Sequence, residues 1–160
     1  MAKGIFITPE KCTGCRICEL TCSFSKFNDF NPKDASIRIL SVEEEGLQVP
    51  MTCIQCDEPD CVEVCPVEAL VKDQETGVVN YNQELCIECS ACVEACPYGS
   101  ITYSVRLSRI IKCDQCSGEP QCVKSCPSGA LEFKELNSQL KEMRQKIASQ
   151  YSKAFKEVAE

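Results

Sequence analysis

The sequence predicts an α+β fold: two small cysteine-rich units, one nested inside the other along the chain, followed by a long amphipathic helix. Three observations predict it, namely four regularly spaced groups of cysteines, short β-type stretches separated by turns, and a C-terminal segment with helical periodicity. The chain has 160 residues, of which 16 are cysteine, and it has no histidine or tryptophan. Apart from the cysteines its apolar content is low for this length, so we expect something besides aliphatic packing to hold the fold together.

Composition excludes several classes of function. A chain without histidine forms neither a Ser-His-Asp nor a Cys-His catalytic unit, and it offers no histidine ligand to a metal. The formal net charge of −7 argues against nucleic acid as a partner. No apolar run is long enough to cross a bilayer and residues 1–12 carry no export signal, so we expect a cytoplasmic protein without direct membrane insertion. Thiols stay reduced there, so the cysteines indicate metal binding rather than disulfides.

All of the cysteines fall into four groups of four. The first and third groups have the spacing C-x2-C-x2-C-x3-C, and the second and fourth have four and five residues in the middle spacer. Three groups end in Cys-Pro, whereas Ser23 follows the first group. In chain order the groups are Cys12, Cys15, Cys18 and Cys22; Cys53, Cys56, Cys61 and Cys65; Cys86, Cys89, Cys92 and Cys96; and Cys113, Cys116, Cys122 and Cys126.

This spacing is typical of [4Fe-4S] binding in bacterial-type ferredoxins, where three cysteines of a group hold one cluster and the fourth holds a neighbouring cluster. The proline after the fourth cysteine suits the start of a turn or helix. A zinc site made of cysteines shows two C-x2-C pairs around a longer spacer, which these groups match poorly. The sequence therefore predicts four [4Fe-4S] clusters with every cysteine as a ligand.

Because each group gives one thiolate to a second cluster, the groups must work in pairs. Between the second and third groups, residues 67–70 indicate a short helix and residues 70–81 a β-hairpin, the link that joins the halves of a two-cluster ferredoxin. We therefore pair these two groups, and the first and fourth pair by elimination, with strands at 4–8 and 130–133 flanking them. Residues 100–113 indicate another hairpin. The alternative, first with second and third with fourth, would place a long cysteine-free stretch inside one small unit.

That cysteine-free stretch runs from Ser23 to Thr52. Phe24, Phe27 and Phe30 recur at steps of three and indicate a short helical turn, for which a place in the local core is favoured over a partner contact. Two strands are predicted on either side of the acidic Glu43-Glu44-Glu45-Gly46 turn.

Three basic residues, Arg106, Arg109 and Lys112, precede the fourth group. They could offset cluster charge or contact an acidic partner. Their place in a strand-rich stretch favours ordinary charges facing solvent.

The C-terminal segment 137–160 contains no glycine, proline or cysteine, and its apolar residues recur at steps of three and four. Asn137 or Ser138 can cap the N-terminus of the predicted helix. The segment from residue 134 is positively charged and the rest of the chain is negative. We therefore favour docking on a catalytic subunit or on a second copy, which could build a filament, over packing on the chain's own body.

These motifs resemble the four-cluster ferredoxin-like electron-transfer subunits of molybdenum and tungsten enzymes such as formate dehydrogenase, dimethyl sulfoxide reductase and polysulfide reductase. The resemblance covers residues 5–133, and the small size and the first cysteine group narrow it toward the small subunits of tungsten aldehyde oxidoreductases. It implies four ligand sets. They are site I, Cys12, Cys15, Cys18 and Cys126; site II, Cys113, Cys116, Cys122 and Cys22; site III, Cys53, Cys56, Cys61 and Cys96; and site IV, Cys86, Cys89, Cys92 and Cys65.

The resemblance implies a subunit without a catalytic site. It would relay single electrons between a tungsten- or molybdenum-pterin catalytic subunit and a flavin- or NAD-linked subunit, a ferredoxin or another carrier. The alternatives are a free soluble polyferredoxin, or a subunit of a formate dehydrogenase, hydrogenase or carbon monoxide dehydrogenase complex. The expected division is an outer unit at 1–30 and 97–133, an inserted hairpin segment at 31–52, an inner unit at 53–96, and a helix for docking or assembly at 134–160.

Overall fold

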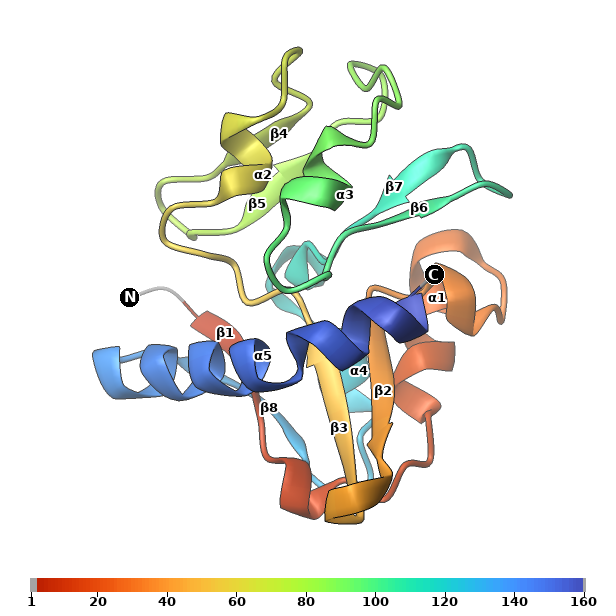
Figure 1. The fold of residues 1–160 in the computed structure, drawn as a ribbon, viewed down its shortest axis with the longest axis vertical. Coiled ribbons are helices and arrows are strands. Elements are labelled where there is room, and N and C mark those ends of the chain that lie inside the picture. The colour runs from red at the N-terminus through yellow and green to blue at the C-terminus, as the bar shows by residue number, and fades with distance from the viewer. Residues whose placement is uncertain (1–2, 160) are drawn as a thin grey trace.

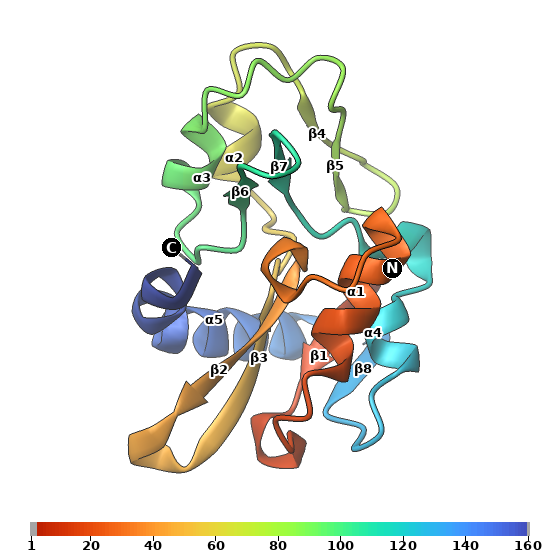
Figure 2. The same cartoon turned by 90° about the vertical axis from the view of Figure 1, so that its right-hand side faces the viewer.

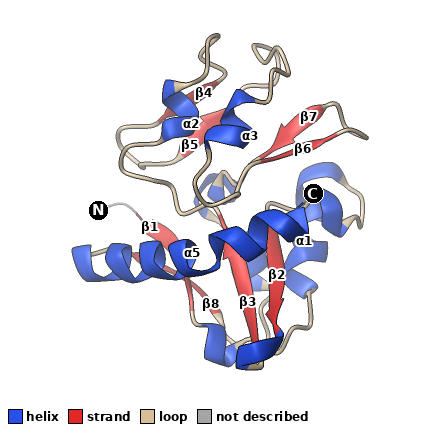
Figure 3. Ribbon diagram, viewed as in Figure 1, coloured by secondary structure: helices blue, strands red, loops and turns tan. Residues whose placement is uncertain are grey.

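Short helices and short β-hairpins make up the computed structural model, which describes residues 3–159 (Figure 1). The strands form four separate two-stranded antiparallel sheets (Figure 3), so the predicted α+β class is confirmed. The strands are β1 Lys3–Ile7, β2 Ile37–Val42, β3 Leu47–Thr52, β4 Leu70–Lys72, β5 Val79–Tyr81, β6 Thr102–Ser104, β7 Arg109–Ile111 and β8 Leu131–Glu135. The helices are α1 Ile17–Phe27, α2 Asp60–Glu63, α3 Ala91–Ala95, α4 Gln121–Lys124 and α5 Ser138–Ala159.

The strand pairing joins segments that are far apart in the sequence. β1 pairs with β8, with Ile5 opposite Phe133, so the two predicted flanking strands meet. The other pairs are hairpins, β2 with β3, β4 with β5 and β6 with β7, and each lies where the sequence predicts one. Every cysteine group therefore begins or ends next to a short sheet that fixes its position.

The elements gather in two halves (Figures 1 and 2). One half holds α2, α3 and the hairpins β4–β5 and β6–β7, and the other holds β1, β8, the β2–β3 hairpin, α1, α4 and α5. Ile101, just before β6, and Ile110, in β7, pack with Leu70 and Val79. The β6–β7 hairpin therefore packs with the β4–β5 hairpin.

The prediction of a helix at residues 67–70 is wrong. The backbone there is a turn in which Glu68 has a φ of 51°, and the amide of Ala69 lies 3.2 Å from the sulfur of Cys65. A regular helix would point these amides along its own axis, whereas the turn points one of them at the thiol. The helix of this segment is instead α2, which ends before Cys65.

The long C-terminal helix packs on its own chain. Its apolar residues meet the β2–β3 hairpin in one core cluster, which includes Leu40, Val49, Met51, Ala148, Tyr151 and Phe155. Tyr151 also donates a hydrogen bond of 2.6 Å to Glu45. The preference for docking this face on another chain, or on a second copy in a filament, is therefore corrected, because the apolar face of the hairpin that receives α5 was not foreseen from its sequence.

The start of α5 gives a test of local stability. Asn137 accepts a hydrogen bond of 2.9 Å from the amide of Leu140, so of the two predicted capping residues the structure uses Asn137. We expect Asn137→Ala to lower the free energy of unfolding by about 1 kcal/mol, because it leaves an amide of the first turn unpaired. Ser138→Ala is the matched control, with almost no effect expected. Thermal unfolding of the cluster-loaded variants measures both, and equal effects would contradict this assignment.

Two of the three phenylalanines predicted to lie in the local core, Phe24 and Phe30, are exposed, whereas Phe27 is half-buried. Phe24 and Phe30 stack with their ring centres 4.5 Å apart, and they are 43% and 64% exposed. Their assignment to the local core is wrong, because Phe30 lies beyond the end of α1 and the two rings cover mainly each other.

Among the helices described between residues 3 and 159, none has the length and apolar character needed to span a bilayer.

Candidate iron–sulfur sites

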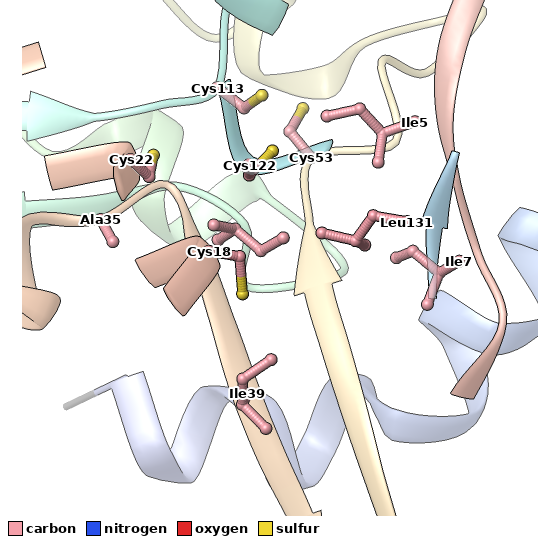
Figure 4. Packing of buried hydrophobic residues seen from close by; sticks show 11 residues of the cluster. Ile5, Ile7, Cys18, Cys22, Ala35, Ile39, Cys53, Cys113, Cys122 and Leu131 are labelled. Atoms are coloured by element: carbon pink, nitrogen blue, oxygen red, sulfur yellow. The ribbon is translucent and has the colours of Figure 1, made fainter. Parts of the chain in front are cut away.

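Three cavities are each lined by four cysteines, and each set combines three cysteines of one group with the fourth cysteine of another. The sets are Cys53, Cys56, Cys61 and Cys96; Cys22, Cys113, Cys116 and Cys122; and Cys65, Cys86, Cys89 and Cys92. They have the same members as sites III, II and IV. Cys53, Cys113 and Cys122 are seen close together in Figure 4, where site II approaches site III.

The cysteines of site I also lie near one another. Burial raises the pKa of Cys12, and the charges of Cys126 and Cys15 raise it further, so these sulfurs are within electrostatic range. Burial likewise raises the pKa of Cys18 to about 12, with Cys12 and Cys15 among its charged neighbours. Cys12 follows β1 and Cys126 precedes β8, so the pairing of these strands brings the two ends of the chain to one site.

A repeated backbone feature aims amides at the first sulfur of a group. The residue before the second cysteine is left-handed in all four groups, an arrangement that costs about 1–2 kcal/mol for residues other than glycine. In two groups its amide lies 3.4–3.5 Å from the sulfur of the first cysteine, as at Gln55 and Gln115. The sequence does not indicate this left-handed conformation, because only one of the four residues is glycine. They are Gly14 (φ 68°), Gln55 (φ 52°), Glu88 (φ 58°) and Gln115 (φ 55°).

The fourth cysteine of a group has its own amide donors. The amides of Ala69 and Ser100 lie 3.2 and 3.3 Å from the sulfurs of Cys65 and Cys96, each four residues further along the chain. Burial opposes ionisation of Cys126, but Ser128 and the backbone amides of Leu131 and Ala130 outweigh it, so its pKa is lowered. In the three Cys-Pro groups the turn after the proline therefore wraps the sulfur.

Cys22, which Ser23 follows instead of proline, departs from this pattern in the structure as well. Its sulfur accepts a hydrogen bond of 3.3 Å from the amide of Ser36, which lies just before β2. The inserted segment 31–52 therefore supplies the amide donor for this fourth cysteine, which in the other groups comes from the turn after the proline.

The thiols are suited to cluster binding. Burial raises the pKa of Cys113 to about 12, and the charges of Cys53 and Cys22 add to it. Burial also raises the pKa of Cys61 to about 12. Such thiols ionise at neutral pH only when a cation compensates them, and iron does so. Sulfur-only donor sets with amides aimed at the sulfurs fit [4Fe-4S] clusters.

The three basic residues before the fourth group do not simply face solvent, and that prediction is corrected. Arg106 donates to Asp34, and Arg109 lies over two aromatic rings. Lys112 is only 9% exposed, and its ammonium lies 3.7 Å from the sulfur of Cys53. The alternating burial of a strand edge does not apply here, because Ile110 and Ile111 of β7 are both buried and Lys112 after them is buried too.

The fold and the cysteine sites define a class of protein, the ferredoxin-like iron–sulfur proteins. A family model described as a 4Fe-4S dicluster domain matches residues 45–136, and one described as a 4Fe-4S binding domain matches residues 9–25. The chain belongs to the 4Fe-4S dicluster domain family. With 16 cysteines in such motifs, it carries four [4Fe-4S] clusters, as predicted.

Several known proteins are similar to most of the chain. The polyferredoxin-like subunit of the aliphatic sulfonate oxidoreductase of Pyrococcus furiosus is 44% identical over 119 residues, which cover 74% of this chain and 68% of that protein. A probable anaerobic dimethyl sulfoxide reductase chain, YnfG of Escherichia coli, is 36% identical over 163 residues, covering 89% and 76%. Such relatives are iron–sulfur electron-transfer subunits of oxidoreductases, so the prediction of a non-catalytic subunit is confirmed.

A similar fold occurs in a solved structure, the active site complex BamBC of benzoyl coenzyme A reductase with benzoyl-CoA. It superposes with a TM-score of 0.50 at 26% sequence identity, covering 99% of this chain and 95% of the other.

Proposed function

We propose that the chain relays single electrons through clusters at sites I, II, III and IV, in that order, inside an oxidoreductase complex. At one end its partner is a tungsten- or molybdenum-pterin catalytic subunit, and at the other a flavin- or NAD-linked subunit or a ferredoxin. A [4Fe-4S] cluster with four thiolate ligands has no open position for substrate and supplies one-electron transfer. The protein's part is to hold the clusters close together and to exclude water from them.

One observation carries the ligand assignment. Three separate cavities are each lined by one complete set of four cysteines, drawn from two groups in the nested pairing. The alternative pairing, first with second and third with fourth, would mix different groups in each cavity. A structural zinc site would need no such exchange of the fourth cysteine between neighbouring sites.

Contacts between the sets support the order of the relay. Cys18 of site I is a charged neighbour of Cys122 of site II. Cys53 of site III is likewise a neighbour of Cys113 of site II. Sites III and IV share a core cluster that includes Cys61, Cys92 and Cys96.

The exposure of the cysteines supports the location of the two ends. Cys15 of site I and Cys89 of site IV are exposed, whereas the cysteines of sites II and III are buried or half-buried. Electrons therefore enter and leave at opposite ends of the relay, beside these two cysteines.

The relatives support a partner that performs the chemistry. One is named as a subunit of a sulfonate oxidoreductase, and another as a chain of a dimethyl sulfoxide reductase. The narrower assignment to a tungsten aldehyde oxidoreductase rests on the resemblance of the first cysteine group.

Anaerobic isolation of the native complex tests this function. We expect the chain to co-purify with a catalytic subunit that contains tungsten or molybdenum, and to hold about 16 iron atoms. A reductive titration of the chain should take up about four electrons, one for each cluster. Elution of the native protein as a monomer would favour a free polyferredoxin instead, and zinc in place of iron would overturn the relay.

A further inference from the structure

A buried lysine lies at the boundary between the two halves of the molecule. Lys112 connects β7 to the fourth cysteine group, and its ammonium donates to the carbonyls of Val79 at 2.9 Å and Cys113 at 3.1 Å. It also lies 3.3 Å from the side-chain oxygen of Gln55 and 3.7 Å from the sulfur of Cys53. The ammonium therefore contacts cysteine residues of sites II and III at once.

A second buried cation approaches the same place from α5. Arg144 is 6% exposed, and its Nη2 has no hydrogen-bond partner among the described residues. The charges that act on it come from Cys53, Cys113 and Cys56, which again belong to sites II and III. Gly4 leaves room for the guanidinium, since a Cβ there would lie 2.9 Å from Arg144 Nη1.

Among the residues that the structure describes, neither of these buried cations has a carboxylate partner at hydrogen-bond distance, so both need another source of compensation. Each cluster with four thiolates carries a charge of −2 when oxidised and one more negative charge when reduced. Clusters at sites II and III would place that charge beside Lys112 and Arg144. The cations then favour the reduced form of each cluster over the oxidised form, because attraction grows with the cluster's negative charge.

We propose that Lys112 and Arg144 raise the reduction potentials of the two middle clusters, at sites II and III, relative to the terminal clusters at sites I and IV. This proposal rests on the relay proposed above. Each step moves one electron, so that one cluster is oxidised and its neighbour is reduced, with no bond made or broken. The two cations then stabilise an electron at the boundary between the halves.

Redox titration of the intact, cluster-loaded chain tests the proposal. Lys112→Gln removes the charge and keeps an N–H donor, and Arg144→Gln removes the charge of the second cation. Lys153→Gln is the matched control, because it changes the net charge equally from an exposed position on α5. We expect two of the four midpoint potentials to become more negative in both test variants, and the other two to follow the control. Arg144→Lys should restore the potentials toward those of the unchanged protein.

The outcomes separate this proposal from the relay itself. Four unshifted potentials in a variant with full iron content would show that the cations are only structural, and so would equal shifts of all four. If Lys112→Gln loses iron, the test passes to Arg144→Gln, whose Nη2 has no hydrogen bond to lose. An unchanged protein that fails to take up four electrons would contradict the relay, whatever the variants do.

Discussion

Removing iron and sulfide by anaerobic chelation is expected to unfold the protein almost completely. The four sheets have two strands each, and such hairpins are marginally stable alone. Two of the three core clusters contain cysteines that would lose their cluster, among them Cys18, Cys53 and Cys92. Structural metal sites contribute about 10–16 kcal/mol in small domains, as much as the whole net stability of a typical domain.

Circular dichroism and thermal unfolding of the iron-free chain measure this effect. We expect loss of the cooperative transition, and its recovery when iron and sulfide are restored under anaerobic conditions. The control is the same chelation procedure followed at once by reconstitution, which excludes damage by the reagent. A single cooperative transition in iron-free protein would show that aliphatic packing alone specifies the fold.

Asp34→Ala is expected to cause the largest loss of stability among substitutions remote from the cysteines. Asp34 is 3% exposed and accepts hydrogen bonds from Ser104 at 2.6 Å, Asn31 at 2.8 Å and Arg106 at 3.0 Å. It therefore ties the inserted segment to the β6–β7 hairpin. Breaking such a buried network lowers the free energy of unfolding by about 3–5 kcal/mol. Because Arg106 is half exposed, we expect a loss at the lower end of this range, about 3 kcal/mol.

Asp29→Ala provides the matched control. Asp29 also pairs with Arg106, at 3.1 Å, but both side chains are about half exposed. Exposed ion pairs contribute about 0–1 kcal/mol, so this variant should unfold close to the temperature of the unchanged protein. Equal losses in the two variants would mean that the burial of Asp34 has no bearing on stability.

The contribution of Asp34 should depend on pH in a defined direction. Burial opposes its ionisation, but the hydrogen bonds from Ser104 and Arg106 outweigh burial and hold its pKa below the usual value. A carboxylate with a lowered pKa stabilises the fold fully above its unfolded pKa of about 4, and the contribution disappears as pH falls through the lower folded value. The difference in stability between Asp34→Ala and the unchanged protein should therefore shrink only in acid.

The cysteine spacing predicts ligand groups because such a pattern depends on short distances along the chain. The four hairpin and strand pairs were also predicted, since alternating residues and turns mark them locally. What the spacing could not supply is the backbone between ligands. Gln55 and Glu88 adopt a left-handed backbone conformation, which their residue types do not predict.

Contacts between the halves were the least predictable part. Lys112 directly follows β7, and it is buried by contacts with residues that are distant in the sequence, among them Val79 and Cys53. The place of α5 was missed for the same reason, because nothing in the sequence of the β2–β3 hairpin indicates that α5 covers Val49 and Met51. In both cases the tertiary arrangement decides which residues are covered.

The pairing of β1 with β8 constrains the order in which the parts of the protein can fold during synthesis. During translation Lys3–Ile7 emerges from the ribosome long before its hydrogen-bonding partner, Leu131–Glu135. The cysteines from residue 53 to residue 96 are by then already synthesised, so the interior half can mature while the N-terminal strand still waits. Premature termination before residue 131 would consequently leave a chain able to finish only its interior half, with an unpaired leading strand.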